Sequence, residues 1–509
     1  MMEKYVIGLD IGTTSAKAVL FKKNGSVIAE SEWGYSVSHP NPSWSEQDPI
    51  IIEKAAITAI RSVTKKAGVM KKQVIAVGIS TAMHSLICVD NKYNPLSPSI
   101  IWADGRSVEQ ANKLRLQTDI YLKTGTPIHP MSPLCKLVWM KENDYQPYIE
   151  AAMFVSIKEF LLLRWFGEAV VDYSIASATG LFNIHTFDWD DDVLEVAGVT
   201  RNQLSKPVGP TAICQGLTSE LANLLGLETD TPFVLAGSDG PLANLGIGAI
   251  APGDVAITVG TSGAIRQMAS KPQTDNRQEV FCYAVTEDRW IMGGPTNNGG
   301  IVFQWLRDVL GEKEVELALT KGENAYELLT KLASTVTPGS DGLLFLPFLN
   351  GERAPYWDAN ARGSFIGLTM AHKKEHMIRA GLEGVVFSLY SVAVALERLA
   401  GESINIFASG GFARSPLWLQ IVADIFGQPV HVPQSHQSSA WGAAWFALLA
   451  VGEASSLESI KDSIPMKQTY EPNNLASNNY KELYKTYYQL YEVLKPHFST
   501  IANYQRNVK

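Results

Sequence analysis

The chain has few cysteines and no long apolar run. Its four cysteines, Cys88, Cys135, Cys214 and Cys282, lie far apart and form neither a Cys-x-x-Cys pair nor a zinc-ligand spacing. This pattern favours reduced thiols and a cytoplasmic protein. The longest apolar stretch, Ala440–Val451, is too short to span a bilayer and predicts a buried helix. Because the N-terminus runs directly into an apolar strand, we expect no signal peptide and no membrane partner.

The chain also lacks an excess of positive charge. The formal net charge is −8, which argues against nucleic acid or an anionic membrane surface as a partner. Hydrophobic residues make up 46% of the chain and charged residues 18%, as in a folded globular protein. A length of 509 residues exceeds what one hydrophobic core supports, so we expect two large domains.

The first polar motif lies in Gly8–Lys17, which reads GLDIGTTSAK. Three apolar, β-prone runs surround it, at Tyr5–Ile7, Ala18–Phe21 and Val27–Ala29. The Asn24-Gly25 pair between the last two runs is typical of a tight hairpin. These features predict three antiparallel strands with a polar turn after the first.

The polar turn has the residues of a phosphate-binding loop. Gly12 allows a ligand to approach the backbone, and Thr13, Thr14 and Ser15 offer amides and hydroxyls to phosphate oxygens. Asp10 is suited to hold a hydrated Mg²⁺, which binds through one or two carboxylates. A hairpin with a polar bend and no ligand explains this short motif equally well.

A second turn of the same kind opens the second half of the chain. The strand-like run Val255–Val259 ends in Gly260-Thr261-Ser262-Gly263 and is followed by Ala264-Ile265. An internal repeat at this spacing predicts two related halves, which we place at residues 1–248 and 249–509. Two such turns suit a nucleotide triphosphate bound between domains. The arrangement resembles the actin/hexokinase-like ATPase superfamily.

Several further elements follow from local pattern. Asp48 and Pro49 predict the start of a helix through Ala67, whose apolar residues recur at helical spacing. The strand Val74–Ile79 ends in a polar cluster that contains His84, although a lone histidine of this kind equally fits a protein core. We also expect Ile100–Arg106 to form a strand ending at the same edge of the sheet.

Two longer motifs resemble those of a known family. Met131–Asn143, MSPLCKLVWMKEN, matches the first signature of the FGGY carbohydrate kinases, and Gly363–Glu383 matches the second except at Gly381, which we interpret as a packing variation. The resemblance extends from Gly8 to about Gly452. It implies an α/β fold of two domains, of the actin/hexokinase-like (ribonuclease H-like) ATPase type, with an inter-domain cleft.

Within the family, the chain is most similar to bacterial gluconokinases. The stretches that carry this similarity are Ile101–Ser107, Thr124–Leu134, Val171–Gly180, Ser238–Gly246, Gly260–Arg266, Gly293–Val302, Gly342–Trp357 and Ile501–Arg506. Met83-His84 is shared with xylulokinases and replaces the Arg-Glu pair of glycerol kinases. The resemblance implies phosphorylation of D-gluconate by ATP with Mg²⁺. A xylulokinase or another sugar or polyol kinase is the alternative, and a non-kinase actin-like ATPase switch is a more distant one.

The resemblance also implies roles for individual residues. Asp239 corresponds to the general base of the family, although an Asp-Gly-Pro turn after a strand also suits a helix cap. The expected substrate-binding residues are Met83, His84, Asp239 and Gly240, and the expected Mg²⁺ ligands are Asp10 and Asp239. The expected ATP-binding residues are Gly12, Thr13, Thr14, Ser15, Gly260, Thr261, Gly300, Gln304, Gly411, Phe412 and Ser415.

The sequence leaves two questions open. Arg106, Lys158 and Arg353 are each candidates for the cation that meets the substrate carboxylate, and each also suits a structural ion pair. The expected partners are a small sugar acid and ATP, while a homodimer is left open.

Overall fold

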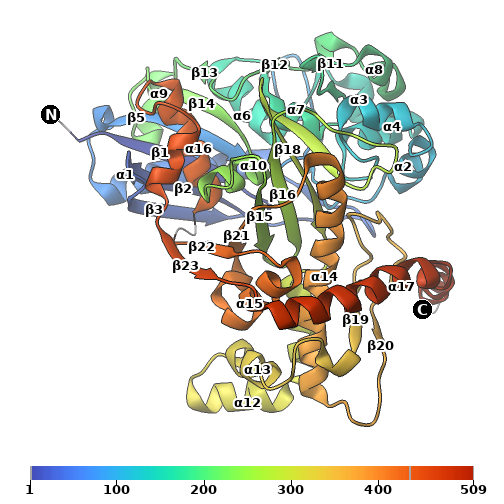
Figure 1. The fold of residues 1–509 in the computed structure, drawn as a ribbon. Helices are drawn as coiled ribbons and strands as arrows, with labels where there is room; N and C mark the ends of the chain where they lie inside the picture. The colour runs from blue at the N-terminus through green and yellow to red at the C-terminus, as the bar shows by residue number, and fades with distance from the viewer. Residues whose placement is uncertain (1–2, 435–436, 508–509) are drawn as a thin grey trace. The chain divides into compact units, whose positions relative to one another are not determined.

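In the computed structural model, which describes residues 3–434 and 437–507, the chain forms two compact units (Figure 1). The first unit contains the chain through Ala251 together with Met268–Ile291 and Gln437–Ile464. The second contains the remaining residues. The segments 268–291 and 437–464 therefore join the first unit although they follow the sequence boundary at 248.

The first unit is a mixed α/β structure. Its elements are β1 (Tyr5–Ile11), β2 (Ser15–Lys22), β3 (Val27–Gly34), β4 (Glu46–Gln47), α1 (Pro49–Ala67), η1 (Lys71–Gln73), β5 (Val74–Thr81), β6 (Ile87–Val89), β7 (Ser99–Ile100), α2 (Val108–Leu114), α3 (Thr118–Thr124), α4 (Pro133–Glu142), α5 (Gln146–Glu150), β8 (Met153–Val155), α6 (Ile157–Phe166), β9 (Val170–Asp172), α7 (Tyr173–Ala178), β10 (Phe182–Asn183), β11 (Asp188–Trp189), α8 (Asp191–Ala197), η2 (Arg201–Gln203), β12 (Lys206–Val208), β13 (Ile213–Cys214), α9 (Ser219–Leu225), β14 (Phe233–Ser238), α10 (Asp239–Gly246), β17 (Phe281–Thr286), α16 (Ser438–Ala450) and η5 (Glu458–Ser463).

The main sheet of this unit has the strand order β13-β14-β5-β1-β2-β3. β1, β2 and β3 form the expected antiparallel meander, while β5 and β14 run parallel to β1. Alternate residues of β1 enter different cores: Ile7 and Leu9 belong to one cluster and Val6 to the other. The central strands are therefore buried on both faces, which explains their nearly continuous apolar sequence.

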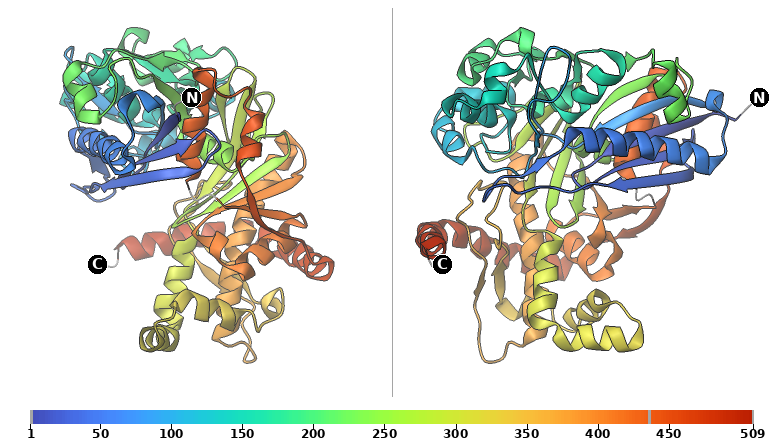
Figure 2. Two further views of the ribbon diagram at one scale, coloured as in Figure 1. Left: turned by 90° about the vertical axis from the view of Figure 1, so that its left-hand side faces the viewer. Right: turned by 180° about the vertical axis from the view of Figure 1, so that it is seen from behind.

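Helix α1 covers one face of this sheet, as Figure 2 shows along β2 and β3. Its start is the predicted one: the Asp48 side chain accepts hydrogen bonds from the amides of Ile50 and Ile51, at 2.8 and 3.4 Å. Gly68 ends the helix in the left-handed conformation that favours glycine.

Helix α16 is the predicted buried helix, and it packs against β1, β5 and α10 of the first unit. Its backbone lies so close that a Cβ on Gly8 would stand 2.0 Å from the carbonyl oxygen of Ala440, and one on Gly78 would stand 1.9 Å from that of Ala443. Only glycine fits at these two strand positions. The close approach explains why a glycine stands at each of these two positions in otherwise apolar strands.

The second unit is also built on a sheet. Its elements are β15 (Asp254–Val259), α11 (Gly300–Leu310), α12 (Glu312–Lys321), α13 (Ala325–Ala333), η3 (Ser340–Gly342), β19 (Leu344–Leu346), β20 (Ser364–Ile366), α14 (Lys374–Ala400), β21 (Asn405–Gly410), η4 (Gly411–Arg414), α15 (Pro416–Phe426), β22 (Val430–Pro433), β23 (Met466–Tyr470) and α17 (Asn474–Asn507), and β16 (Gly263–Ala269) and β18 (Arg289–Thr296) complete the assignment.

In the sheet of the second unit, the strands follow the order β18-β16-β15-β21-β22-β23. β15 pairs antiparallel with β16 and parallel with β21, which is parallel to β22. Likewise, β1 pairs antiparallel with β2 and parallel with β5, which is parallel to β14. The repeated polar turn therefore belongs to a repeated arrangement of strands, as the actin/hexokinase-like fold requires.

Helix α14 is the core helix of the second unit. By length and composition it could cross a membrane, but 83% of its apolar window is buried within the protein. The signature residue Gly381 lies on it, and a Cβ there would stand 2.3 Å from Cδ1 of Leu306 on α11. The departure from the family signature therefore lies where α14 packs against α11.

One predicted element is wrong. Ile100–Arg106 does not form a strand of the main sheet; only Ser99–Ile100 is extended, and it pairs with Glu46–Gln47 in a separate two-stranded sheet. The residues after Ile100 instead form a loop, held by side chains described below.

Candidate active site

The two predicted acidic residues meet at the carboxyl ends of parallel strands. Asp10 on β1 lies in register with Ser80 on β5, and Ser80 lies in register with Gly237 on β14. Asp239 follows two residues later as the first residue of α10. The sheet therefore brings Asp10 and Asp239 to one edge, where α/β proteins commonly bind ligands.

The environment of Asp10 suits a cation. Its carboxylate accepts a 2.6 Å hydrogen bond from the Ser80 hydroxyl. Burial raises the pKa of Asp10 to about 6, and the negative charge of Asp239 adds to this rise. Among the described residues, no group of three or more His, Cys, Asp or Glu side chains could hold a metal. Two carboxylates that repel each other instead fit Mg²⁺, which retains most of its water ligands.

The turn after β1 is tightly built. The Gly12 amide donates to the Ser15 carbonyl at 2.9 Å. The carbonyl of Thr13 accepts a hydrogen bond from Nε2 of Gln47 at 2.6 Å. The hydroxyl of Thr13 accepts one from the Trp102 indole at 2.9 Å. The hydroxyl of Ser15 donates to Glu32, so this side chain is already engaged. Thr14 is exposed.

Lys17 was not predicted as a site residue, although it lies near Asp10. It lies directly opposite Asp10 in the antiparallel pair of β1 and β2, which places both side chains on one face of the sheet. Its ammonium is 3.5 Å from the Glu30 carboxylate. The signal was available in the sequence, because a cation two residues after a phosphate-type turn falls on the face of Asp10.

Met83 and His84 lie in the turn after β5. His84 is buried and has a positive φ of 67°, an uncommon conformation for a residue with a side chain. Its Nδ1 lies 2.8 Å from the Ala178 carbonyl oxygen and therefore carries the proton in this contact. Its ring packs edge-on against Tyr283. Met83 is half-buried.

Lys136, within the first family signature, holds this turn in place. Its fully buried ammonium donates to the carbonyl oxygens of His84, Ile100 and Ile101 at 2.6, 3.1 and 2.9 Å. Burial lowers the pKa of Lys136 to about 7. One side chain thus joins the His84 turn to the loop that begins before Trp102.

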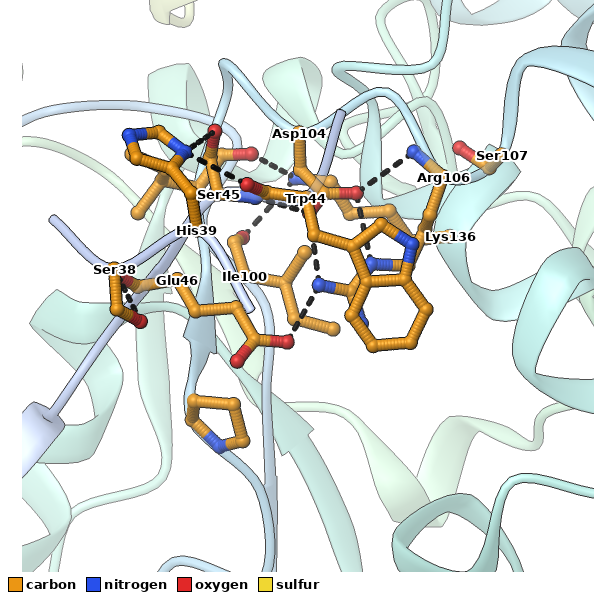
Figure 3. A network of polar contacts seen from close by, with 12 residues as sticks. Ser38, His39, Trp44, Ser45, Glu46, Ile100, Asp104, Arg106, Ser107 and Lys136 are labelled. Carbon is orange, nitrogen blue, oxygen red and sulfur yellow. Dashed lines mark hydrogen bonds and ion pairs between the residues drawn. The ribbon is translucent and has the colours of Figure 1, made fainter. Parts of the chain in front are cut away.

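Figure 3 shows how the end of the same loop is held by Arg106. Its Nε and Nη2 atoms donate to the two oxygens of Asp104, each at 2.8 Å, and Nη2 also donates to Glu46 at 2.6 Å. The guanidinium carbon lies 3.8 Å above the Trp44 ring. Asp104 also accepts from the Ser45 amide at 2.7 Å. The guanidinium of Arg106 thus pairs with two carboxylates, those of Asp104 and Glu46.

The other two candidate cations are also buried. Lys158 in the first unit pairs with Asp172 at 2.7 Å, and both side chains are inaccessible to solvent. Arg353 in the second unit donates through Nη2 to the Thr296 carbonyl at 3.0 Å. Lys158 therefore already has an ion-pair partner within the protein.

In the second unit, the repeated turn packs directly against the start of α11. The Gly260 amide donates to the carbonyl of Ser262, two residues on, at 2.9 Å, whereas the Gly12 amide donates to a carbonyl three residues on. The amides of Gly300 and Ile301 donate to the carbonyls of Gly260 and Thr261 at 2.7 and 3.0 Å. A Cβ on Gly300 would stand 2.6 Å from the Gly260 oxygen, so this approach requires glycine.

A pocket of about 630 Å³ opens beside this turn. That volume lies in the range of small-molecule and cofactor sites. Predicted ATP-binding residues that line it are Gly260, Gly300, Gly411, Phe412 and Ser415. Thr261 and Gln304 are not among its lining residues.

Other residues of this pocket were not found from sequence. Phe303 and Tyr326 pack against each other with ring centroids 5.1 Å apart, and Trp418 packs edge-on against Phe303. Lys331 and Arg414 add positive charge to the lining. Aromatic residues on three separate helices carry no local motif, although their flat rings suit a nucleotide base.

Comparison with known proteins agrees with both halves of this description. Residues 5–246 match the N-terminal domain of the FGGY family of carbohydrate kinases, and residues 255–451 match its C-terminal domain. The chain is 45% identical over 511 aligned residues to a protein of Bacillus subtilis (strain 168) described as "Gluconokinase", covering 100% of this chain and 99% of that protein.

Solved structures show the same likeness. A gluconate kinase from Lactobacillus acidophilus superposes with a TM-score of 0.93 at 35% identity, covering 98% of this chain and 100% of that one. A ligand-bound xylulose kinase from the same organism superposes with a TM-score of 0.92, also at 35% identity and with the same coverage.

Proposed function

Because the chain belongs to the FGGY family of carbohydrate kinases, we propose that it transfers the γ-phosphoryl group of ATP to D-gluconate, giving ADP and 6-phospho-D-gluconate. The observation that carries the choice of substrate is the 45% identity, over the full chain, to the Bacillus subtilis gluconokinase. The sheet edge with Asp10 and Asp239 supplies the acidic groups that such a transfer needs.

In the proposed mechanism, Asp239 is the general base. Its carboxylate accepts the proton of the acceptor hydroxyl while the hydroxyl oxygen bonds to the γ-phosphorus. The bond from that phosphorus to the bridging oxygen of ADP breaks. A bound Mg²⁺ would offset the phosphate charge, and Asp10 and Asp239 are the residues we expect to hold it. Met83, His84 and Gly240 are the remaining substrate-binding assignments.

ATP is assigned to two sets of residues. Gly12, Thr13, Thr14 and Ser15 supply amides and hydroxyls for phosphate oxygens in the first unit, where the Lys17 ammonium adds a cation. In the second unit the assigned residues are Gly260, Thr261, Gly300, Gln304, Gly411, Phe412 and Ser415. The pocket beside Gly260 supports this assignment because its volume and aromatic lining suit a base and ribose.

A substrate panel tests the proposal. With MgATP, we expect D-gluconate to give a kcat/KM about 100-fold above those of D-xylulose and glycerol, since a site that hydrogen-bonds polar substrate groups rejects compounds that lack them. Phosphorus NMR of the product should show a 6-phosphate ester. A higher kcat/KM for D-xylulose would favour the xylulokinase alternative, for which the similar xylulose kinase structure is a reason. ATP hydrolysis independent of any sugar would favour an ATPase switch.

The proposed reaction indicates the cellular location and the partners of the enzyme. We place the enzyme in the cytoplasm, where ATP is available, with the sugar acid and ATP as its partners and neither nucleic acid nor a membrane. Homodimer formation remains open for measurement by sedimentation.

A further inference from the structure

Strand β14, which leads to Asp239, contains an irregularity just before its end. Val234 pairs with Gly78 of β5, but the next pair joins Gly237 to Ser80. Three steps on β14 thus match two on β5, which is a β-bulge with one extra residue. Within the bulge, Ala236 is buried and has a positive φ of 52°, which is disfavoured for a residue with a Cβ. Bulges of this kind redirect the residues that follow them.

Lys158 on α6 holds the bulge on both sides. Its ammonium donates to the carbonyl oxygens of Leu235 and Gly237, which flank Ala236, at 2.8 and 2.7 Å. The third hydrogen bond, at 2.7 Å, goes to Oδ2 of Asp172. All three hydrogens of this fully buried ammonium are therefore used at one site.

Asp172 and Ser174 hold the next residue of the strand. Oδ1 of Asp172 accepts a 2.6 Å hydrogen bond from the Ser174 hydroxyl. The same hydroxyl accepts a 2.8 Å bond from the amide of Ser238, the residue immediately before Asp239. The chain leading into Asp239 is thus fixed at the carbonyls of the bulge and again at the Ser238 amide.

Stability of the fold alone does not explain the buried Lys158–Asp172 ion pair of this cluster. A buried ion pair is a weak source of stability, because the cost of removing both charges from water offsets their attraction. Here the pair lies against a strained backbone segment two to three residues before the proposed base. We propose that Lys158, Asp172 and Ser174 are positioning residues that fix the bulge at Ala236 and thereby the place of the Asp239 carboxylate. The inference rests on the proposed role of Asp239.

The principal test compares Lys158→Met with the wild-type enzyme. Methionine has similar length but cannot hold the two carbonyls, so we expect kcat for gluconate phosphorylation to fall by about 10²-fold, the cost of a small misplacement of a reacting group. KM values for ATP and gluconate should change by less than about 3-fold, because the variant leaves ground-state contacts intact. Lys54→Met, at an exposed position of α1, is the matched control and should retain full activity.

A second substitution links the effect to the bulge. Glycine adopts a positive φ without penalty, so adding Ala236→Gly to Lys158→Met should restore part of the lost kcat. Ser174→Ala removes only the hydroxyl that binds the Ser238 amide, and we expect a smaller fall in kcat. This milder variant keeps the inference testable if Lys158→Met does not fold.

The outcomes separate this inference from the proposed function. If Asp239→Asn abolishes turnover while folded Lys158→Met and Ser174→Ala keep the wild-type kcat, the positioning role is wrong and the base assignment stands. If Asp239→Asn retains near-normal turnover, both are wrong. A lowered melting temperature with unchanged kcat per folded molecule would make the cluster purely structural.

Discussion

Asp10 near the end of β1 and Asp239 just after β14 lie at one edge of the sheet, with β5 between the two strands. The charge of Asp239 adds to burial in raising the pKa of Asp10 to about 6. The folded protein therefore binds a proton at Asp10 more tightly than the unfolded chain does. The Asp10 contribution to stability is fully present below pH 4 and is lost as the pH rises through 6.

Because ionisation of Asp10 destabilises the folded protein, a substitution that removes its charge should be stabilising. Without Mg²⁺, Asp10→Asn should raise the free energy of unfolding at pH 8 by on the order of 1–3 kcal/mol, because a neutral side chain avoids the cost of an ionised buried carboxylate. At pH 4 the difference should nearly vanish. Urea unfolding at the two pH values measures this. Equal effects at both pH values would show that ionisation of Asp10 is not the cause.

Asp239 itself gives the second prediction. Asp239→Asn should reduce kcat by roughly 10²–10⁴, the usual contribution of a positioned general base, and leave the binding of gluconate and ATP within a few-fold. Stopped-flow or steady-state rates combined with calorimetric binding separate the two effects. Near-normal turnover in the folded variant would reduce Asp239 to the first residue of α10.

The repeated turn gives the third prediction. Thr261 is exposed beside Gly260, and its carbonyl accepts the Ile301 amide, so the side chain is not needed for that contact. Thr261→Val should therefore raise the KM for ATP about 10-fold through loss of a hydroxyl that binds phosphate, with little change in the KM for gluconate. Equal losses for both substrates would indicate a structural turn.

Local pattern predicted the elements on which the site is built. The Gly-Thr turns, the Asp48 cap and the strand leading to Asp239 each depend on residues adjacent in sequence. Helix α16 could be predicted as buried, but its place in the first unit could not, because it packs against strands about 360–430 residues earlier in the chain.

The roles of the buried lysines could not be predicted either. Lys136 and Lys158 bind mainly backbone carbonyl oxygens from distant segments. Because every residue has such a carbonyl, the sequence does not show which ones accept these hydrogen bonds. The predicted strand at Ile100–Arg106 failed for a related reason. Its apolar start resembled a strand, but the following residues are held as a loop by Arg106, Asp104 and Glu46, a network that joins segments about 60 residues apart.

Lys136 gives the last prediction. Its ammonium is the common partner of the His84 carbonyl and of the two carbonyls before Trp102, so its loss should release the His84 turn and that loop together. Lys136→Met should raise the KM for gluconate by about 10-fold or more, because two loops must then be ordered when substrate binds. The KM for ATP should change less, since only one part of the assigned ATP site, the turn at Gly12, is near this loop, while the pocket beside Gly260 lies wholly in the second unit.

Steady-state kinetics with each substrate varied in turn measures this difference. Lys141→Met, at an exposed position of the same helix, is the matched control and should behave as wild type. Equal increases in both KM values would mean that Lys136 supports the first unit as a whole and does not hold the His84 turn.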